Sequence, residues 1–389
     1  MTGNPIYLDN STAARPSEKA ISGMQPIYQK FWGAASAPHG KGLELTSLIT
    51  EAYQGLYTFL GAKPRDTIIL TSSGAEAVNH AIYSSYCDIT LNTGKNQFLC
   101  SSTDEAPAIM SMGRLERFGN VCRLLPAGPK GYVEAKTFAD YVNPRTALLT
   151  LSWANGLTGV IQPLNEIASI CFERGIRLHL DATHVLGKLY FELEDTGADL
   201  ISFNGAQLHA PQGTGALFIK EGIKIPPFIV GGLDQAGQRA GTLDLAKLTA
   251  LHIAVKEAAE ARDLLCTETA RLRNRLETLV TNGFPDAKIL FQESERLPNC
   301  SAIAFPGIAN EALLYSLNRK QVYASIGGGN FQQISFVLEA CGTPRSLAAC
   351  AVSFSLSRET TEAEIERAAE IIVENAIKLR KTSSYLIPT

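Results

Sequence analysis

Short apolar runs alternate with stretches of helical spacing through much of the chain. Seven of the runs are too short for helices and predict buried strands: Thr67–Thr71, Asn96–Ser101, Val121–Leu125, Thr146–Trp153, Ile176–Asp181, Leu200–Asn204 and Gly215–Ile219. Between them, apolar positions three and four apart predict helices at Glu76–Cys87, Glu105–Phe118 and Leu164–Arg174. This alternation is typical of βαβ units, so we expect an α/β fold with a mostly parallel sheet covered on both faces.

The segments before and after these units follow different patterns. The first 40 residues contain several prolines, Pro26 among them, and predict irregular structure. Apolar positions from Leu43 to Leu60 then predict a helix that Gly61 ends. Near the other end of the α/β region, helical spacing continues without interruption over Leu243–Val280, which predicts one long helix.

The C-terminal part mixes short strands with helices. The predicted elements are strands at Ser301–Phe305 and Ala351–Leu356 and helices at Glu311–Leu317 and Thr361–Lys378. Thr361 and Glu364 have the spacing of a capping box. We therefore predict a large α/β domain over residues 1–250 and a smaller α+β domain over residues 251–389, joined by the long helix. The N-terminal segment is expected to be able to pack on the smaller domain.

Composition excludes several classes of protein. Of the 389 residues 45% are hydrophobic and 19% are charged, a balance opposite to that of disordered chains. The net charge of −3 gives no basic surface for nucleic acid. No apolar stretch is long enough to span a membrane, and the N-terminus has no signal-peptide pattern. The eight cysteines form no C-x-x-C pair, so we expect a cytoplasmic protein without zinc, other metals or disulfides.

Candidate chemistry lies just after the predicted strands, where parallel α/β sheets bind ligands. The turn that leads from Thr71 to Glu76 starts a helix and could hold an anion, or could simply connect strand and helix. Asp181 ends another strand and could hold a cationic ring nitrogen, or could cap a loop. Asn155 and Asn204 both precede glycine, which is ordinary turn chemistry.

Taken together, these segments resemble a known family. The motifs in question are IYLDNSTA, GAASAPHGKG, TSSGAEAVNHAI, HLDATHVLGKL, DLISFNGAQLHAPQGTGALF, QRAGT and FSLSRETTEAEIE. In order and spacing they resemble the cysteine desulfurases of the class V aminotransferase family, and the resemblance covers the chain from about residue 6 to about residue 378. The resemblance implies a fold type I, pyridoxal phosphate (PLP)-dependent transferase architecture, with a mostly parallel seven-stranded sheet and a smaller α+β domain.

The resemblance assigns roles around the cofactor ring. Asp181 matches the Asp that pairs with the pyridine nitrogen and keeps it protonated, which makes the ring an electron sink. His184 stands where the family has a Gln that contacts the ring oxygen. Asn155 matches an Asn at the edge of the cofactor or substrate.

Further matches concern the phosphate and the substrate. The phosphate is expected on Ser73, Gly74 and Ala75, where Ala75 replaces the usual Thr, and beside Asn204, which replaces a Ser. Thr242 matches a Thr that reaches the phosphate of the partner subunit, which implies a homodimer with shared sites. Arg358 matches the Arg that binds the substrate carboxylate, a bidentate role.

Three reactive groups of the family are missing. Gln207 occupies the position of the Lys that forms the Schiff base, and an amide is neither a nucleophile nor a general base. Ala106 replaces the His that stacks on the ring. The segment Ser325–Asn330 matches the loop of the desulfurase Cys but contains no Cys, and Cys341 and Cys350 follow in patterns typical of packed elements.

These departures leave three functional hypotheses. The first is a binding or regulatory pseudoenzyme, which acts as a homodimer, pairs with an active relative, senses PLP or an amino acid, or holds a sulfur-transfer partner. The second is an enzyme that binds PLP or its amine form noncovalently and uses His184 or His209 as base. The third is an active class V aminotransferase or cysteine desulfurase. The cofactor is accordingly PLP held without a covalent bond, or none.

Overall fold

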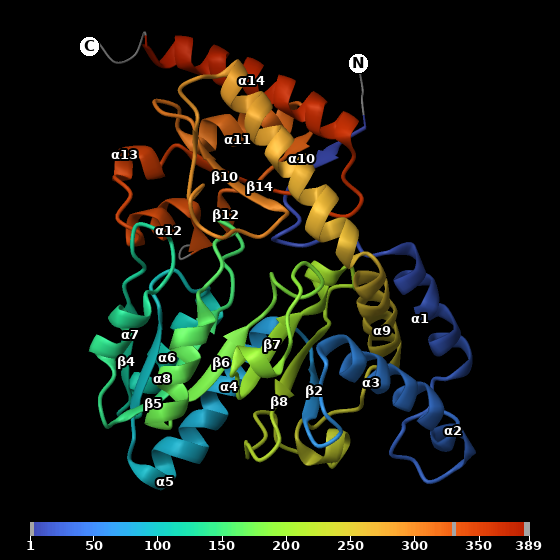
Figure 1. Cartoon of the computed structure of the whole chain (residues 1–389). Coiled ribbons are helices and arrows are strands. Elements are labelled where there is room, and N and C mark those ends of the chain that lie inside the picture. The colour runs from blue at the N-terminus through green and yellow to red at the C-terminus, as the bar shows by residue number, and fades with distance from the viewer. Residues whose placement is uncertain (1–3, 329–331, 385–389) are drawn as a thin grey trace.

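A seven-stranded sheet occupies the centre of the larger part of the molecule (Figure 1). The structure, a computed structural model, describes residues 4–328 and 332–384. The strand order is β2-β8-β7-β6-β5-β3-β4, and β8 alone is antiparallel to its neighbours. The strands are β2 Thr67–Thr71, β3 Gln97–Ser101, β4 Val121–Leu125, β5 Thr146–Ser152, β6 Arg177–Asp181, β7 Leu200–Asn204 and β8 Gly215–Ile219. The predicted fold class and all seven predicted strands are thus confirmed.

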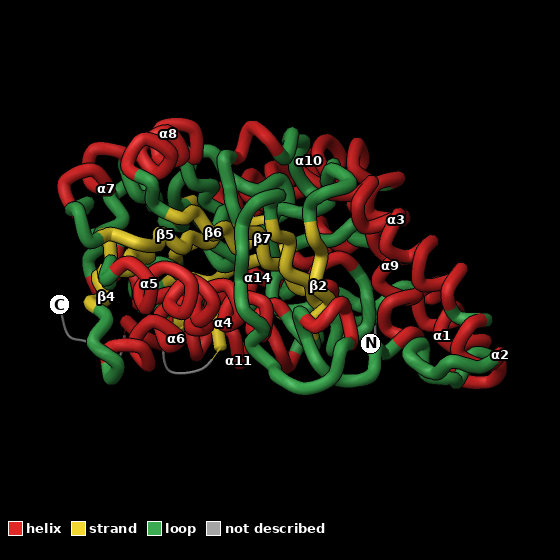
Figure 2. The backbone as a smooth tube through the Cα atoms, turned by 90° about the horizontal axis from the view of Figure 1, so that it is seen from below, coloured by secondary structure: helices red, strands yellow, loops and turns green. Residues whose placement is uncertain are grey.

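Helices cover both faces of this sheet. Helices α7 (Ala135–Tyr141) and α8 (Leu164–Arg174) lie on one face, and α4 (Gly74–Ser85) and α6 (Ala106–Glu116) lie on the other (Figure 2). At the β2 end of the sheet, α3 (Thr46–Leu60) packs on α9 (Leu245–Glu260), which also packs on α1 (Glu18–Lys30).

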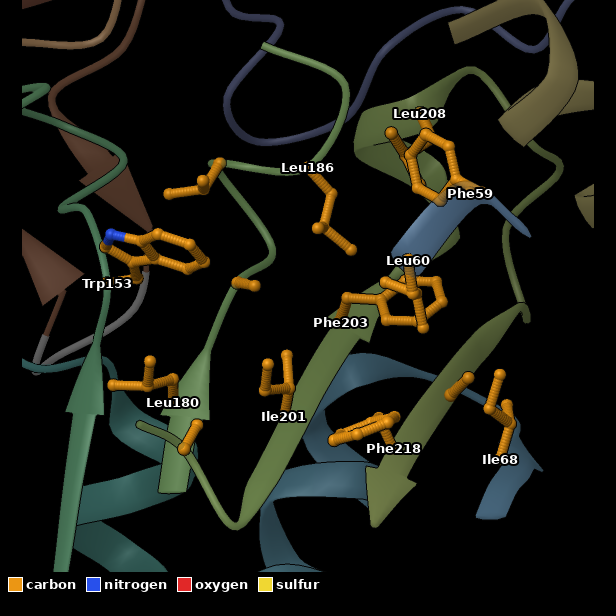
Figure 3. Close-up of a cluster of buried hydrophobic side chains, with 14 of the residues drawn as sticks. Phe59, Leu60, Ile68, Trp153, Leu180, Leu186, Ile201, Phe203, Leu208 and Phe218 are labelled. Carbon is orange, nitrogen blue, oxygen red and sulfur yellow. The ribbon is translucent and has the colours of Figure 1, made fainter. Parts of the chain in front are cut away.

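The main hydrophobic core joins the sheet to these helices. Phe203 and Ile201 of β7 and Phe218 of β8 lie in the same cluster as Leu60 of α3 and Trp153, which follows β5 (Figure 3). All strands except the edge strand β4 are buried along nearly their whole length. Strands buried on both faces are rich in apolar residues, and this pattern made their positions predictable from the sequence.

A second core lies in the C-terminal part of the chain. A three-stranded antiparallel sheet of order β14-β10-β9 packs with α10, α11 and α14 (Figure 1). The elements of this part are β9 Lys288–Ile289, β10 Cys300–Ala304, β14 Ala351–Ser355, α10 Arg262–Gly283, α11 Asn310–Arg319, α12 Ile334–Ala340, α13 Arg345–Ala348 and α14 Glu362–Ser384. Ile6 and Leu8 from the N-terminus belong to the same core. The proposed boundary at residue 250 stays a prediction.

The remaining elements are short. β1 (Ile6–Tyr7) pairs in parallel with β11 (Val322–Tyr323), and β12 (Gly327–Gly328) pairs with β13 (Gln332–Gln333). Two further helices are α2 (Gly40–Leu43) and α5 (Leu91–Thr93). Among the helices of the described ranges, none combines the length and the apolar composition that a membrane crossing requires.

The structure corrects two predictions about helices. The N-terminal segment, expected to be irregular, contains α1 (Glu18–Lys30) with Pro26 inside it. Ser17 caps this helix by accepting a hydrogen bond from the Ala20 N–H, and its packing against α9 compensates for the proline.

The long helix expected over residues 243–280 is two helices, α9 (Leu245–Glu260) and α10. They separate at Ala261, whose backbone leaves the helical conformation (φ −91°, ψ 2°). The capping box before α14 is confirmed, because Thr361 and Glu364 exchange hydrogen bonds between side chain and backbone N–H.

Candidate functional site

A cavity of about 180 Å³ opens where the carboxyl ends of the parallel strands meet the C-terminal part and the N-terminal segment. Its walls include Asp104 and Glu105 after β3, Asn155 after β5, His184 after β6 and Gln207 after β7. The structure therefore brings three of the residues singled out from sequence, Asn155, His184 and Gln207, to one cavity. It adds Asp104 and Glu105, which the sequence reasoning did not assign to the site.

Asp181, the last residue of β6, offers one carboxylate oxygen to a ligand. Its Oδ1 accepts hydrogen bonds from the Thr183 hydroxyl at 2.6 Å and the Thr183 N–H at 3.0 Å. In the part of the chain that the structure describes, no hydrogen bond uses Oδ2. Burial, with Glu105 nearby, raises the pKa of Asp181 to about 6. A protonated ring nitrogen at Oδ2 would favour the ionised form of this carboxyl.

His184 forms a close pair with Glu105. Its Nε2 lies 2.6 Å from Glu105 Oε1, although the two residues are 79 positions apart in the sequence. Burial alone would raise the pKa of Glu105, but the charge and the hydrogen bond of His184 hold it below its usual value. His184 is 6% exposed, and its Nδ1 has no hydrogen-bond partner among the described residues. Gly156 is required beside it, because an added Cβ would lie 2.5 Å from the imidazole.

Gln207 is held by hydrogen bonds on both sides of its amide. The nitrogen donates to the carbonyls of Ser11 at 3.1 Å and Thr12 at 2.9 Å. The oxygen accepts from Asn204 Nδ2 at 2.8 Å. The side chain, in a residue that is 7% exposed, thus ties the N-terminal segment to the end of β7.

Asn155 is engaged in the same way. Its amide nitrogen donates to the Thr103 carbonyl, and its oxygen accepts from the N–H groups of Leu157 and Thr158. These bonds fix the turn after β5. Asn155 therefore shapes the wall of the cavity, because both polar atoms of its side chain are engaged within the turn.

In the turn expected to hold a phosphate, backbone N–H groups are present, but few side chains can donate a hydrogen bond. Ser73 caps α4, and its hydroxyl accepts from the Glu76 N–H at 3.2 Å. Gly74 packs on Asn204, because an added Cβ would lie 2.9 Å from the Asn204 Cβ. Ala75 has no hydroxyl, and the Asn204 amide is already bonded to Gln207. The carboxylate of Glu76 accepts from the Ser72 N–H and adds negative charge to this helix start.

Within a single chain, Thr242 is not part of the turn that is expected to hold the phosphate. It lines a separate cavity of about 180 Å³ together with Thr71, Ser72, Arg239 and Lys247. Arg239 itself is paired with Glu76, with Nε and Oε1 at 2.9 Å. The expected contact with a partner's phosphate involves a second chain and stays a prediction.

Arg358 and His209 lie in a small neighbouring cavity of about 20 Å³, which Gln207 also lines. The Arg358 guanidinium pairs with Glu257 at 2.9 Å. His209 Nδ1 lies 2.7 Å from the Arg15 carbonyl oxygen, and burial, together with Arg358, lowers the pKa of His209 to about 4. The two candidate bases are therefore separated, since only His184 lines the larger cavity.

Lys188 lines this smaller cavity as well and was missed in the sequence. The residue is 7% exposed, its ammonium nitrogen has no hydrogen-bond partner among the described residues, and burial lowers its pKa to about 8. Lys188 comes from the loop after β6 and reaches the cavity that Gln207, after β7, also lines.

Ala106 begins α6 and carries only a methyl group at the position of the stacking His. Cys341 and Cys350 are buried, as their sequence patterns predict, and burial raises the pKa of Cys341 to about 12. Gly329 and Asn330, at the end of the segment that matches the loop of the desulfurase Cys, lie outside the described residues.

The fold and this sequence have clear relatives. The sequence model of aminotransferase class V matches residues 6–368. A cysteine desulfurase of Gluconacetobacter diazotrophicus is 32% identical over 388 residues, which is 98% of this chain and 96% of that protein. The chain belongs to the class V aminotransferase family. The cysteine desulfurase NifS of Azotobacter vinelandii is 31% identical over 385 residues, with 98% and 94% of the two chains covered.

Solved structures agree with this family assignment. A NifS-like protein superposes with a TM-score of 0.90 at 26% identity and covers 97% of this chain and 100% of its own. A second NifS-like protein, from Rickettsia africae, has a TM-score of 0.83 at 21% identity, with coverage of 97% and 100%, and supports the fold alone.

The cofactor of this PLP-dependent family fits the cavity only in part. Asp181 Oδ2 suits a protonated ring nitrogen, although Asp181 is not among the described residues that line the cavity. The phosphate half has lost side-chain donors. Ala75 lacks the hydroxyl, and the Asn204 amide is bonded to Gln207. Backbone N–H groups remain for a dianion there, and the carboxylate of Glu76 at the helix start is paired with Arg239.

Proposed function

We propose that this chain is a ligand-binding or regulatory member of the class V aminotransferase family that has lost Schiff-base and desulfurase chemistry. The observation that carries the proposal is the state of Gln207. Its amide nitrogen and oxygen are engaged with Ser11, Thr12 and Asn204, so the residue is part of the scaffold. An amide nitrogen is not nucleophilic and does not accept a substrate proton near neutral pH.

The other groups of the parent reaction have no substitute in the cavity. Within the described residues no lysine or cysteine lines it. Lys188 lines the neighbouring small cavity instead. Sulfur transfer requires a thiolate within reach of the substrate, and the buried Cys341 keeps its proton because burial raises the pKa of its thiol to about 12.

The proposal also covers cofactor and partners. PLP, where it binds, is held without a covalent bond and chiefly by its ring, through Asp181. The protein acts in the cytoplasm as a homodimer, or as a heterodimer with an active relative, through the surface around Thr242. An amino-acid ligand is disfavoured as long as Glu257 occupies the guanidinium of Arg358.

One observation favours a second candidate, an enzyme with a noncovalent cofactor. His184 lines the cavity, is oriented by Glu105 and keeps Nδ1 without a partner, which is the arrangement of a general base with its orienting carboxylate. His209 is less suited to this role, because its ring is bonded to the Arg15 carbonyl beside the smaller cavity.

Sulfide release from L-cysteine tests the main proposal. The purified protein is incubated with PLP, L-cysteine and a thiol reductant, and the Gluconacetobacter desulfurase serves as positive control. We expect no sulfide above the protein-free blank. Sulfide production at a rate comparable to that of the control would contradict the proposal and favour an active desulfurase.

Deuterium exchange separates the two candidates. L-Alanine is incubated in D₂O with PLP and the protein, and exchange of the α-proton is followed by NMR. We expect no exchange beyond that of PLP alone. Exchange in the wild type that is lost in His184→Gln would establish the second candidate, because glutamine keeps a hydrogen bond to Glu105 but cannot accept the proton.

A further inference from the structure

An open cavity of about 900 Å³ lies apart from the candidate site. It is formed by the loops after β5 and β6, the starts of α7 and α8, and residues 293–295 of the C-terminal part. We call it the outer groove. It shares no lining residue with the cavity that Gln207 and His184 line, so a ligand bound here is independent of the function proposed above.

The rim of the outer groove is acidic. Two lysines, Lys130 and Lys136, lie on it together with six exposed carboxylates, which are Glu134, Glu166, Glu192, Asp195, Glu293 and Glu295. In the described part of the chain, none of these six forms an ion pair with a lysine, arginine or histidine. Charge of one sign along a groove attracts a ligand of opposite charge. Exposed carboxylates alone are ordinary on a protein surface, and the floor of the groove distinguishes this one.

Two hydrogen-bond donors on the floor of the outer groove have no acceptor. Trp153 and Gln162 line the groove and are only 7% and 4% exposed. The side-chain oxygen of Gln162 accepts from the Val133 N–H at 3.0 Å, which leaves its amide nitrogen as the free end. Neither this nitrogen nor Trp153 Nε1 has a hydrogen-bond partner among the described residues, and neither is fully enclosed by protein. Both donors therefore open into the groove.

The two donors lie side by side. The Gln162 N–H donates to the Trp153 carbonyl at 2.9 Å, and the adjacent residues Ala154 and Ile161 form an antiparallel bridge. Side chains of residues opposed in this way lie on the same face, about 5 Å apart. The indole nitrogen points away from the hydrophobic cluster (Figure 3), and Phe191 packs on the indole edge to face, with ring centroids 5.0 Å apart. Largely buried indole and amide N–H groups are normally paired, so a ligand acceptor is expected at this position.

The donors and the rim together define the ligand. An anion would offer acceptors to Trp153 and Gln162, but the carboxylates of the rim would repel it. A simple polyamine has the right charge but no acceptor for the two N–H groups. A peptide combines neutral carbonyl acceptors with cationic side chains. The stems and charges of its lysines or arginines can also lie on the rings of Trp153 and Phe191.

From this combination we propose that the outer groove docks a short, extended, basic segment of a partner protein. Backbone carbonyls of the segment accept hydrogen bonds from Trp153 Nε1 and Gln162 Nε2. Its lysine or arginine side chains pair with the carboxylates of the rim. The volume of about 900 Å³ is near the upper end of the range for ligand pockets, about 300–1,000 Å³, and leaves room for more than a single side chain.

Three probes test the two requirements separately. The first is a heptapeptide of alternating lysine and alanine with blocked ends, and the second is the same peptide with glutamate in place of lysine. The third is spermine, which carries as many positive charges as the lysine peptide but no carbonyl. Binding to the full-length protein at low ionic strength is measured by isothermal titration calorimetry. We expect the lysine peptide to bind at least tenfold more tightly than either of the other probes.

A matched pair of triple variants locates the site. The rim variant combines Glu166→Gln, Glu192→Gln and Glu293→Gln. The control variant removes the same charge from exposed residues that do not line the groove, and combines Glu116→Gln, Asp140→Asn and Glu173→Gln. Glu173 lies on the same helix α8 as Glu166. We expect the rim variant to weaken binding of the lysine peptide at least tenfold and the control variant to weaken it less than twofold.

Trp153→Phe tests the hydrogen bond, because it keeps an aromatic ring and removes only the N–H. We expect it to weaken the lysine peptide about fivefold and to leave spermine unchanged, since spermine has no acceptor to lose. Equal weakening of both probes would show that this N–H does not bind the peptide and would overturn the proposal.

Other results would overturn it as well. These are no detectable binding of the lysine peptide, binding of the glutamate peptide or spermine as tightly as the lysine peptide, and equal losses in the two triple variants. A change of oligomeric state in the rim variant, measured by analytical ultracentrifugation, would identify a second copy of this chain as the occupant and would also overturn the proposal. None of these results bears on the loss of Schiff-base chemistry, which the sulfide assay tests.

Discussion

The hydrogen bonds of Gln207 give a stability prediction that does not depend on any ligand. In Gln207→Ala, the carbonyls of Ser11 and Thr12 lose their donors and the amide of Asn204 loses its acceptor. The Ser11 bond is buried, and the other two are partly buried. The variant therefore tests whether this residue now serves the scaffold.

The expected magnitude follows from three lost bonds. Each net hydrogen bond contributes about 1 kcal/mol, and polar groups left without partners add to the cost unless water enters. We expect the free energy of unfolding to fall by about 3 kcal/mol. Gln212→Ala, five positions along the chain at an exposed site, is the control and should change it by less than about 0.5 kcal/mol.

The assay is urea unfolding followed by tryptophan fluorescence. The chain has two tryptophans, and Trp153 is buried directly after β5. Hydrogen exchange of the N-terminal segment provides a local readout, because Ala14 and Ser17 donate backbone hydrogen bonds to Ala206 and His209. A loss below about 1 kcal/mol with unchanged exchange in this segment would refute the scaffold role of Gln207.

Three further predictions concern charge and capping. Because burial raises the pKa of Asp104 to about 7, the folded state binds this proton at a higher pH than the unfolded chain, so the free energy of unfolding in urea titrations should rise as the pH falls from 8 to 5, and less so in Asp104→Asn; an equal pH dependence of the two proteins would contradict this. Glu257→Leu should release Arg358 and raise the affinity for L-alanine about tenfold, by calorimetry, and an unchanged affinity would show that Arg358 does not reach the ligand. Thr361→Ala should lower the unfolding free energy by about 1 kcal/mol in urea titrations, and no change would mean that the capping box contributes nothing.

The sequence predicted the sheet better than the helices around it. Strands buried on both faces are uninterrupted apolar runs between turn residues, so their positions follow directly from composition. The sequence pattern did not predict helix α1, because a proline such as Pro26 disfavours a helix. Packing on α9, which the local sequence does not reveal, stabilises this helix. The sequence pattern did not predict the break at Ala261, because alanine has the highest helix propensity.

The site was predictable only where it follows strand ends or family motifs. Asn155, His184 and Gln207 were found in this way, and all three line the cavity. The pairing of His184 with Glu105 joins residues from different βα units, which no local pattern reveals. Lys188 was overlooked because a buried lysine without a partner looks in sequence like any other lysine of a loop.

The proposed function requires that this chain forms no Schiff base with PLP. The most direct test incubates the wild type and Gln207→Lys with PLP, reduces both with borohydride and measures the intact mass, with peptide mapping of any adduct. We expect no adduct at the cavity in the wild type and a reduced pyridoxyl group on residue 207 of the variant. A stoichiometric adduct on a specific lysine of the wild type, Lys188 above all, would contradict it.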